Sequence, residues 1–62
     1  MTFAELVRLL RVHGFELRRQ KGSKRFYGKA GFEGLLQVDF HGKKEVPTGT
    51  VNKILKDARI KK

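Results

Sequence analysis

The chain has 62 residues, with 15 lysines and arginines against six aspartates and glutamates, and its formal net charge at pH 7 is +9. A chain of this length forms one small domain that buries about 60% of its unfolded surface, so it has no deep cleft between domains. Cysteine is absent, which excludes a disulfide, a thiol nucleophile and a cysteine-based zinc site. The apolar runs are too short to cross a bilayer and the N-terminal residues lack the pattern of a signal peptide, so we expect a cytoplasmic protein.

The first segment has the pattern of an amphipathic helix. Thr2 followed three residues later by Glu5 is a capping-box pattern, and apolar residues then recur at helical spacing. We predict a helix over residues 3–13 that ends at Gly14 in the left-handed conformation, with Phe15 packed back on the last turn.

The apolar period then changes from that of a helix to that of a strand. Phe15 and Leu17 alternate with charged residues until residues 21–23 break the pattern, which predicts a first strand. Residues 25–27 and 35–40 are two further apolar-rich runs separated by a glycine-containing loop, and we predict that they form a hairpin.

Alternation along these strands assigns side chains to faces. In the third strand we expect the apolar residues in the core and their polar neighbours on the other face, that is Leu36, Val38 and Phe40 inside and Gln37, Asp39 and His41 outside. By the same reasoning Phe26 faces the core, and Arg25 and Tyr27 lie on the open face.

The last segment predicts a second helix. Residues 41–47 are typical of a turn, Thr48 or Thr50 is placed to cap the helix, and an apolar stripe then continues to about Ala58. The predicted fold is therefore α+β: helix, strand, strand, strand, helix, with a three-stranded antiparallel sheet and both helices on one face.

Positive charge is concentrated in the middle of the chain. Residues 18–29 carry six lysines and arginines and no acid, whereas residues 1–17 are neutral overall. Such excess charge on a folded surface favours a polyanion or an acidic protein as the partner, because neutralising phosphates releases counterions. The alternative is an ordinary solvated face, as most charge runs are.

Three local features are candidates for function, each with a structural alternative. The turn over residues 21–24 offers backbone amides, the Ser23 hydroxyl and two lysines to a phosphate, or is simply a tight turn. Tyr27 beside Arg25 could stack on an unpaired base, or is ordinary sheet packing. His41 near Asp39 could transfer protons, or is a structural turn histidine.

Several short motifs follow one another along nearly the whole chain: Leu6 to Leu10, His13-Gly14-Phe15, Gln20-Lys21-Gly22-Ser23, Val38-Asp39-Phe40-His41-Gly42-Lys43-Lys44-Glu45-Val46-Pro47, Thr48-Gly49-Thr50-Val51 and Ile54-Leu55-Lys56. Their order and spacing resemble the HicA family of small toxins from bacterial and archaeal type II toxin-antitoxin modules. The resemblance implies one domain over residues 1–62 with a fold similar to the double-stranded-RNA-binding domain. It also implies ribosome-independent cleavage of mRNA and neutralisation by a HicB-like antitoxin.

One position departs from the family pattern. The family's catalytic histidine follows the Gly-Ser of this motif, and here that position is Lys24. In the family the histidine acts as base or acid on the ribose 2′-hydroxyl and the scissile phosphate without a metal. A lysine can instead stabilise charge on the phosphorane-like transition state, which leaves His41 as the other candidate for acid-base chemistry.

The sequence and the resemblance together predict the site residues. We expect catalysis by Lys24 and His41 and RNA binding by Arg18, Lys21, Gly22, Ser23, Arg25, Tyr27, Lys43 and Lys44. The expected partners are mRNA and a HicB-like antitoxin, with no metal, no small-molecule cofactor and no membrane. Two alternatives stay open: a HicA-like module that binds RNA or the antitoxin without cleavage, and a basic protein that binds DNA or ribosomal RNA.

Overall fold

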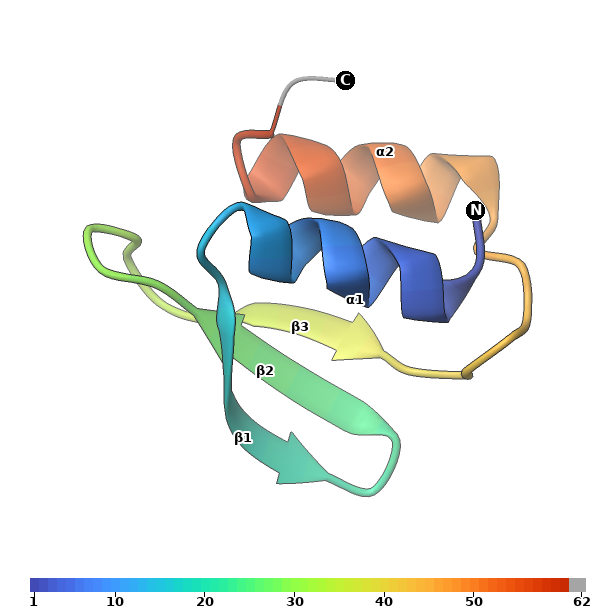
Figure 1. Cartoon of the computed structure of the whole chain (residues 1–62), viewed down its shortest axis with the longest axis horizontal. Helices are drawn as coiled ribbons and strands as arrows, with labels where there is room; N and C mark the ends of the chain where they lie inside the picture. Colours follow the sequence, from blue (N-terminus) through green and yellow to red (C-terminus); the bar gives the residue numbers. More distant parts are fainter. Residues whose placement is uncertain (61–62) are drawn as a thin grey trace.

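The computed structural model describes residues 1–60 and has two helices packed on a three-stranded antiparallel sheet with the strand order β1-β2-β3. The elements are α1 (Phe3–Val12), β1 (Glu16–Lys21), β2 (Lys24–Gly28), β3 (Leu36–Asp39) and α2 (Thr48–Asp57). Both helices lie on the same side of the sheet (Figure 1). The predicted α+β architecture is confirmed, and it is consistent with a fold like the double-stranded-RNA-binding domain.

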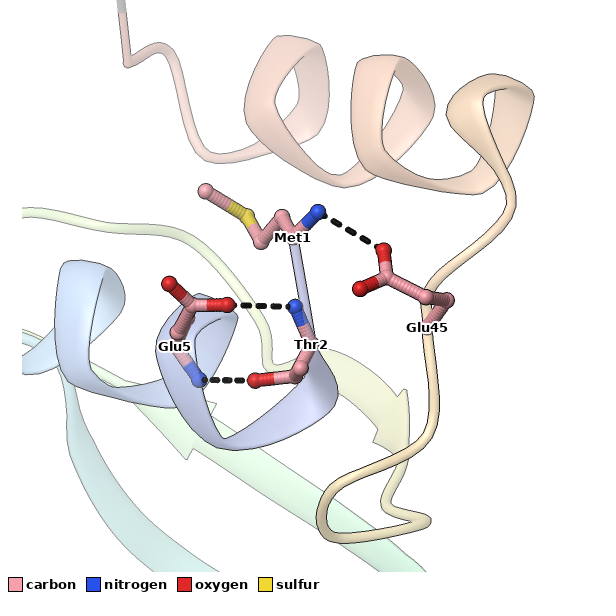
Figure 2. Close-up of polar contacts among 4 residues, drawn as sticks. All are labelled: Met1, Thr2, Glu5 and Glu45. Atoms are coloured by element: carbon pink, nitrogen blue, oxygen red, sulfur yellow. Dashed lines mark hydrogen bonds and ion pairs between the residues drawn. The ribbon is translucent and has the colours of Figure 1, made fainter.

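The predicted caps of α1 are present at both ends. The Glu5 amide donates to Thr2 Oγ1 at 3.2 Å and the Thr2 amide donates to Glu5 Oε1 at 2.8 Å, which completes the capping box (Figure 2). At the other end Gly14 has φ 91°, and the amide of Phe15 donates to the Leu10 carbonyl at 3.0 Å. This is the Schellman arrangement, and it turns Phe15 into the core.

The start of α1 holds the loop that joins β3 to α2. The Met1 ammonium group lies 2.9 Å from Glu45 Oε2 (Figure 2). Three backbone hydrogen bonds reinforce this contact: Phe3 N to Lys44 O at 3.0 Å, Ala4 N to Gly42 O at 2.9 Å and Val46 N to Met1 O at 2.8 Å. The loop that carries His41 is therefore fastened to the first turn of α1.

The core lies between the sheet and the helices. It is built by buried apolar residues from every element except β1, chiefly Phe3, Leu6, Val7, Leu10, Tyr27, Leu36, Val38, Val51, Ile54 and Leu55, together with Phe15, Val46, Ala58 and Ile60. The apolar stripes of the two helices supply most of these side chains, as their periodicity predicts. The other face of the sheet is covered by no helix within residues 1–60 (Figure 1).

The predicted first strand is present as β1, whereas the predicted side-chain cap of α2 is absent. All six residues of β1 are exposed, including Leu17, because β1 is an edge strand and Arg18 forms an irregularity in its pairing with β2. The first residue of α2 is Thr48, and its N-cap is Pro47 without a side-chain cap, so neither threonine caps the helix. The predicted end near Ala58 is confirmed, since Ala58 is the C-cap.

Neither helix is long and apolar enough to span a membrane.

Candidate nucleic-acid interface

The pairing of β2 with β3 decides which residues reach the open face. Tyr27 pairs with Leu36 and Arg25 pairs with Val38, so all of these side chains share the face toward the helices. Tyr27 is only 1% exposed and belongs to the core. Phe26 therefore points to the open face, which reverses the sequence-based assignment of this strand.

Arg25 and Tyr27 contact each other on the side of the helices. The Arg25 guanidinium carbon lies 3.8 Å from the centre of the Phe40 ring, and its Nη1 donates to the Tyr27 hydroxyl at 3.5 Å. Stacking on an aromatic ring is a favourable setting for a guanidinium group. The structure therefore gives both predicted RNA-binding residues a structural role and removes both from the open face.

The open face of the sheet is strongly basic. Lys21 and Lys24 pair across the β1–β2 ladder, and Arg19 pairs with Phe26. A side chain built on Gly28, which shares the face of Phe26, would lie 3.2 Å from Cγ of Arg18, so Arg18 covers this face too. We call this surface the basic face: Arg18, Arg19, Lys21, Lys24 and Phe26. It combines cations with an aromatic ring, as single-strand binding surfaces do.

A polar cluster lies at one edge of the basic face. Asp39 pairs with Lys24 across the β2–β3 ladder, so both side chains point to the open side. Ser23 Oγ donates to Asp39 Oδ1 at 2.8 Å, and Asp39 Oδ2 lies 3.3 Å from His41 Nε2. His41 also packs edge-on against Phe3, with ring centres 5.2 Å apart. The expected proximity of His41 and Asp39 is confirmed.

The Ser23 hydroxyl favours the ionised form of Asp39. Its hydrogen bond holds the pKa of Asp39 below the ordinary value, and the neighbouring His41 and Lys24 act in the same direction. An ionised carboxylate at this position can fix the orientation of the imidazole by accepting its hydrogen bond. The cluster therefore offers an oriented acid-base group next to exposed cations.

Acidic residues gather along one groove of the molecule. A groove of about 980 Å³ lies between β3 and α2. Four of the six acidic residues line it, Glu33, Asp39, Glu45 and Asp57, together with Lys44 and Lys53. Asp39 and His41 line the groove as well, so the polar cluster adjoins both the groove and the basic face. The basic face carries four cationic side chains, so a polyanion is attracted to it more strongly than to the groove, where acids and lysines are mixed.

The remaining predicted residues divide between these regions. Gly22, with φ 60°, stands first in the two-residue turn of the β1–β2 hairpin, where its freedom at positive φ is required. Lys43 and Lys44 are exposed on the loop after His41 rather than on a strand. The open-face position of Phe26 was not predicted, because two adjacent aromatic residues leave the alternation of β2 ambiguous. Arg19 shares this face because the pairing of β1 with β2 shifts at Arg18, which alternation does not reveal.

The comparisons with known proteins agree with this architecture. A family model described as the HicA toxin of bacterial toxin-antitoxin systems matches residues 3–60. The match includes both helices and all three strands. No curated protein matches the chain.

Proposed function

The chain belongs to the HicA family of toxins, and on that premise we propose that it is a cytoplasmic toxin that binds mRNA and cleaves it without a metal. One observation carries the proposal: Asp39 of β3 lies beside His41 and faces Lys24 at the edge of the basic face. Cations that hold phosphates and a group that can move a proton are thus side by side. A metal-independent ribonuclease needs both.

The proposed reaction is attack of a ribose 2′-oxygen on the adjacent phosphorus. The neutral imidazole of His41 accepts the 2′-hydroxyl proton as the bond between phosphorus and the 5′-oxygen breaks. The 5′-oxygen takes a proton from water, and the products are a 2′,3′-cyclic phosphate and a 5′-hydroxyl. Lys24 stabilises the negative charge that develops on the phosphate oxygens, and Asp39 holds the imidazole in place.

The same surface suits an antitoxin. A HicB-like partner that presents acidic groups to Lys24 and its cationic neighbours would exclude RNA by occupying the basic face. RNA and the antitoxin would then compete, and their competition would be measurable with the purified proteins.

A second function is favoured by one specific residue. Lys24 stands where the family pattern has its catalytic histidine, so a module that binds RNA or an antitoxin without cleaving RNA is the alternative. Such a module needs the basic face alone. It does not need the imidazole of His41.

Cleavage of a labelled single-stranded RNA, followed over time in parallel reactions with EDTA and with Mg²⁺, separates the two functions. We expect cleavage by the unaltered protein and its loss in Lys24→Ala and His41→Ala. Asp39→Asn should slow cleavage while RNA binding persists. Lys56→Ala is the matched control, because Lys56 is an exposed lysine in the last turn of α2, away from the sheet.

The outcomes are distinct provided that each variant keeps its circular dichroism spectrum. Intact RNA with all proteins, despite binding, would contradict cleavage and support the binding module. Cleavage that EDTA abolishes would contradict the metal-independent mechanism. Cleavage that survives His41→Ala would contradict the role given to the imidazole.

A further inference from the structure

We propose that Phe26 is a stacking platform for one unpaired base of the bound RNA, an inference that rests on the proposed function and specifies which form of RNA the basic face takes. Phe26 lies in β2, the central strand, and its side chain points away from the helices. The ring is partly exposed and is not part of the hydrophobic core. A flat apolar ring is therefore presented in the middle of a cationic surface.

The neighbours of Phe26 match the chemistry of a nucleobase. Arg19 is its partner on β1, with the guanidinium carbon 6.0 Å from the ring centre, and Gln37 is its partner on β3. A guanidinium plane can stack on a base as an aromatic ring does, and an amide offers both a donor and acceptors to a base edge. Arg19 is thus placed to contact the face of a base, and Gln37 is placed to contact its edge.

The apolar surface continues from Phe26 toward the loop between β2 and β3. Gly28 follows two residues after Phe26 on the same face and has no side chain there. Cδ2 of Leu35 lies 3.1 Å from the position of a Cβ on Gly28, and Leu35 is 49% exposed. Phe26 and Leu35 together extend the apolar area beyond a single ring, which is the kind of surface on which a flat heteroaromatic base packs.

The surrounding cations suit the backbone of the same strand of RNA. Arg18, Lys21 and Lys24 lie around the ring on the basic face, where phosphates on either side of a stacked base could meet them. A base in a duplex is stacked between its neighbours and cannot offer its face to the ring. The platform therefore favours single-stranded segments, loops and bulges over duplex RNA.

Binding of a fluorescently labelled, eight-nucleotide single-stranded RNA at several salt concentrations tests the platform. Phe26→Leu keeps an apolar side chain but removes the aromatic face, and we expect affinity to fall about ten-fold or more. Phe26→Tyr should restore binding close to that of the unaltered protein. Val12→Ala is the matched control, since Val12 is a 75% exposed apolar residue on α1, and it should not change affinity.

The salt dependence distinguishes a base contact from a phosphate contact. Phe26→Leu should leave the slope of log affinity against log salt unchanged, whereas Lys21→Gln should reduce it by about 0.7, the value for one phosphate contact on a single strand. A strand with abasic sites in place of the bases should bind more weakly and should be insensitive to Phe26→Leu. RNA integrity is checked by gel in every sample.

Failure of the inference differs from failure of the proposed function. Equal affinities of the unaltered protein and Phe26→Leu, with both folded, would overturn the platform and leave RNA binding in place. A duplex bound more tightly than the single strand would also overturn it. An unaltered protein that binds neither form would overturn both proposals.

Discussion

Tyr27 lies directly opposite Leu36 in the β2–β3 ladder, and this pairing sets the two faces of the sheet. It places the tyrosine ring in the core, 1% exposed, and leaves Phe26 on the open side. Two adjacent aromatic residues thus have different roles, one in stability and one at the proposed RNA surface.

The first prediction compares truncation of these two rings. Tyr27→Ala should lower the free energy of unfolding by about 3–5 kcal/mol, as for other buried aromatic residues, which is enough to unfold most of a domain this small. Phe26→Ala should cost about 1 kcal/mol or less, because its ring leaves no cavity in the core. Urea denaturation followed by circular dichroism measures both. Equal losses in the two variants would show that the register is different.

Features that depend on local sequence could be predicted. The capping box at Thr2, the left-handed Gly14 and the helical stripe that ends near Ala58 are all set by residues within a turn or two of each other. The periodicity of the apolar residues distinguishes helices from strands, and few architectures bury the apolar faces of two helices and three strands. The α+β fold could therefore be predicted as well.

Features that depend on pairing between residues far apart in the sequence could not be predicted. The choice between Phe26 and Tyr27 as the inward residue is made by the pairing with β3, and nothing within β2 encodes it. The exposure of Leu17 follows from the edge position of β1, which alternation does not reveal. In the candidate site, the proximity of Asp39 and His41 could be predicted from their spacing. The hydrogen bond from Ser23 to Asp39 could not be predicted, because Ser23 lies in the distant turn between β1 and β2.

The second prediction concerns that contact. Ser23→Ala should raise the pKa of Asp39 toward its ordinary value, because the hydroxyl that stabilises the carboxylate is removed. A pH titration of the Asp39 carboxyl carbon by NMR measures the shift directly. Ser23→Thr keeps a hydroxyl and should leave the titration nearly unchanged, and an unshifted pKa in Ser23→Ala would contradict the hydrogen bond.

The stability of the protein should also depend on the ionisation of Asp39. Since the folded form has the lower pKa, ionised Asp39 stabilises the fold above the pKa of the unfolded chain, and this contribution is lost as the pH falls through the folded pKa. The difference in unfolding free energy between the unaltered protein and Ser23→Ala should therefore shrink on acidification below about pH 4. A difference that grows toward low pH would have the wrong sign.

The third prediction is that Thr2→Ala destabilises the fold by about 1 kcal/mol, the usual cost of losing an N-cap. It removes the acceptor of the Glu5 amide, and the same first turn holds the loop that carries His41. Thr2→Ser retains the hydroxyl and should be close to the unaltered protein in urea denaturation. A loss that is the same in both variants would rule out the cap as its cause.

The fourth prediction concerns the end of α2, where Arg59 has φ 58° in the left-handed region. The Ile60 amide donates to the Leu55 carbonyl at 2.9 Å and the Arg59 amide to the Lys56 carbonyl at 3.1 Å, which is a Schellman ending with arginine in the position that glycine usually takes. A side chain in this conformation costs about 1 kcal/mol relative to glycine. Arg59→Ala removes the charge but keeps the Cβ, so Arg59→Gly should be more stable than Arg59→Ala by about that amount in thermal or urea denaturation. A more stable alanine variant would contradict the left-handed conformation at residue 59. Without that conformation the two variants would differ only in the unfolded chain, where the greater flexibility of glycine lowers the stability of Arg59→Gly.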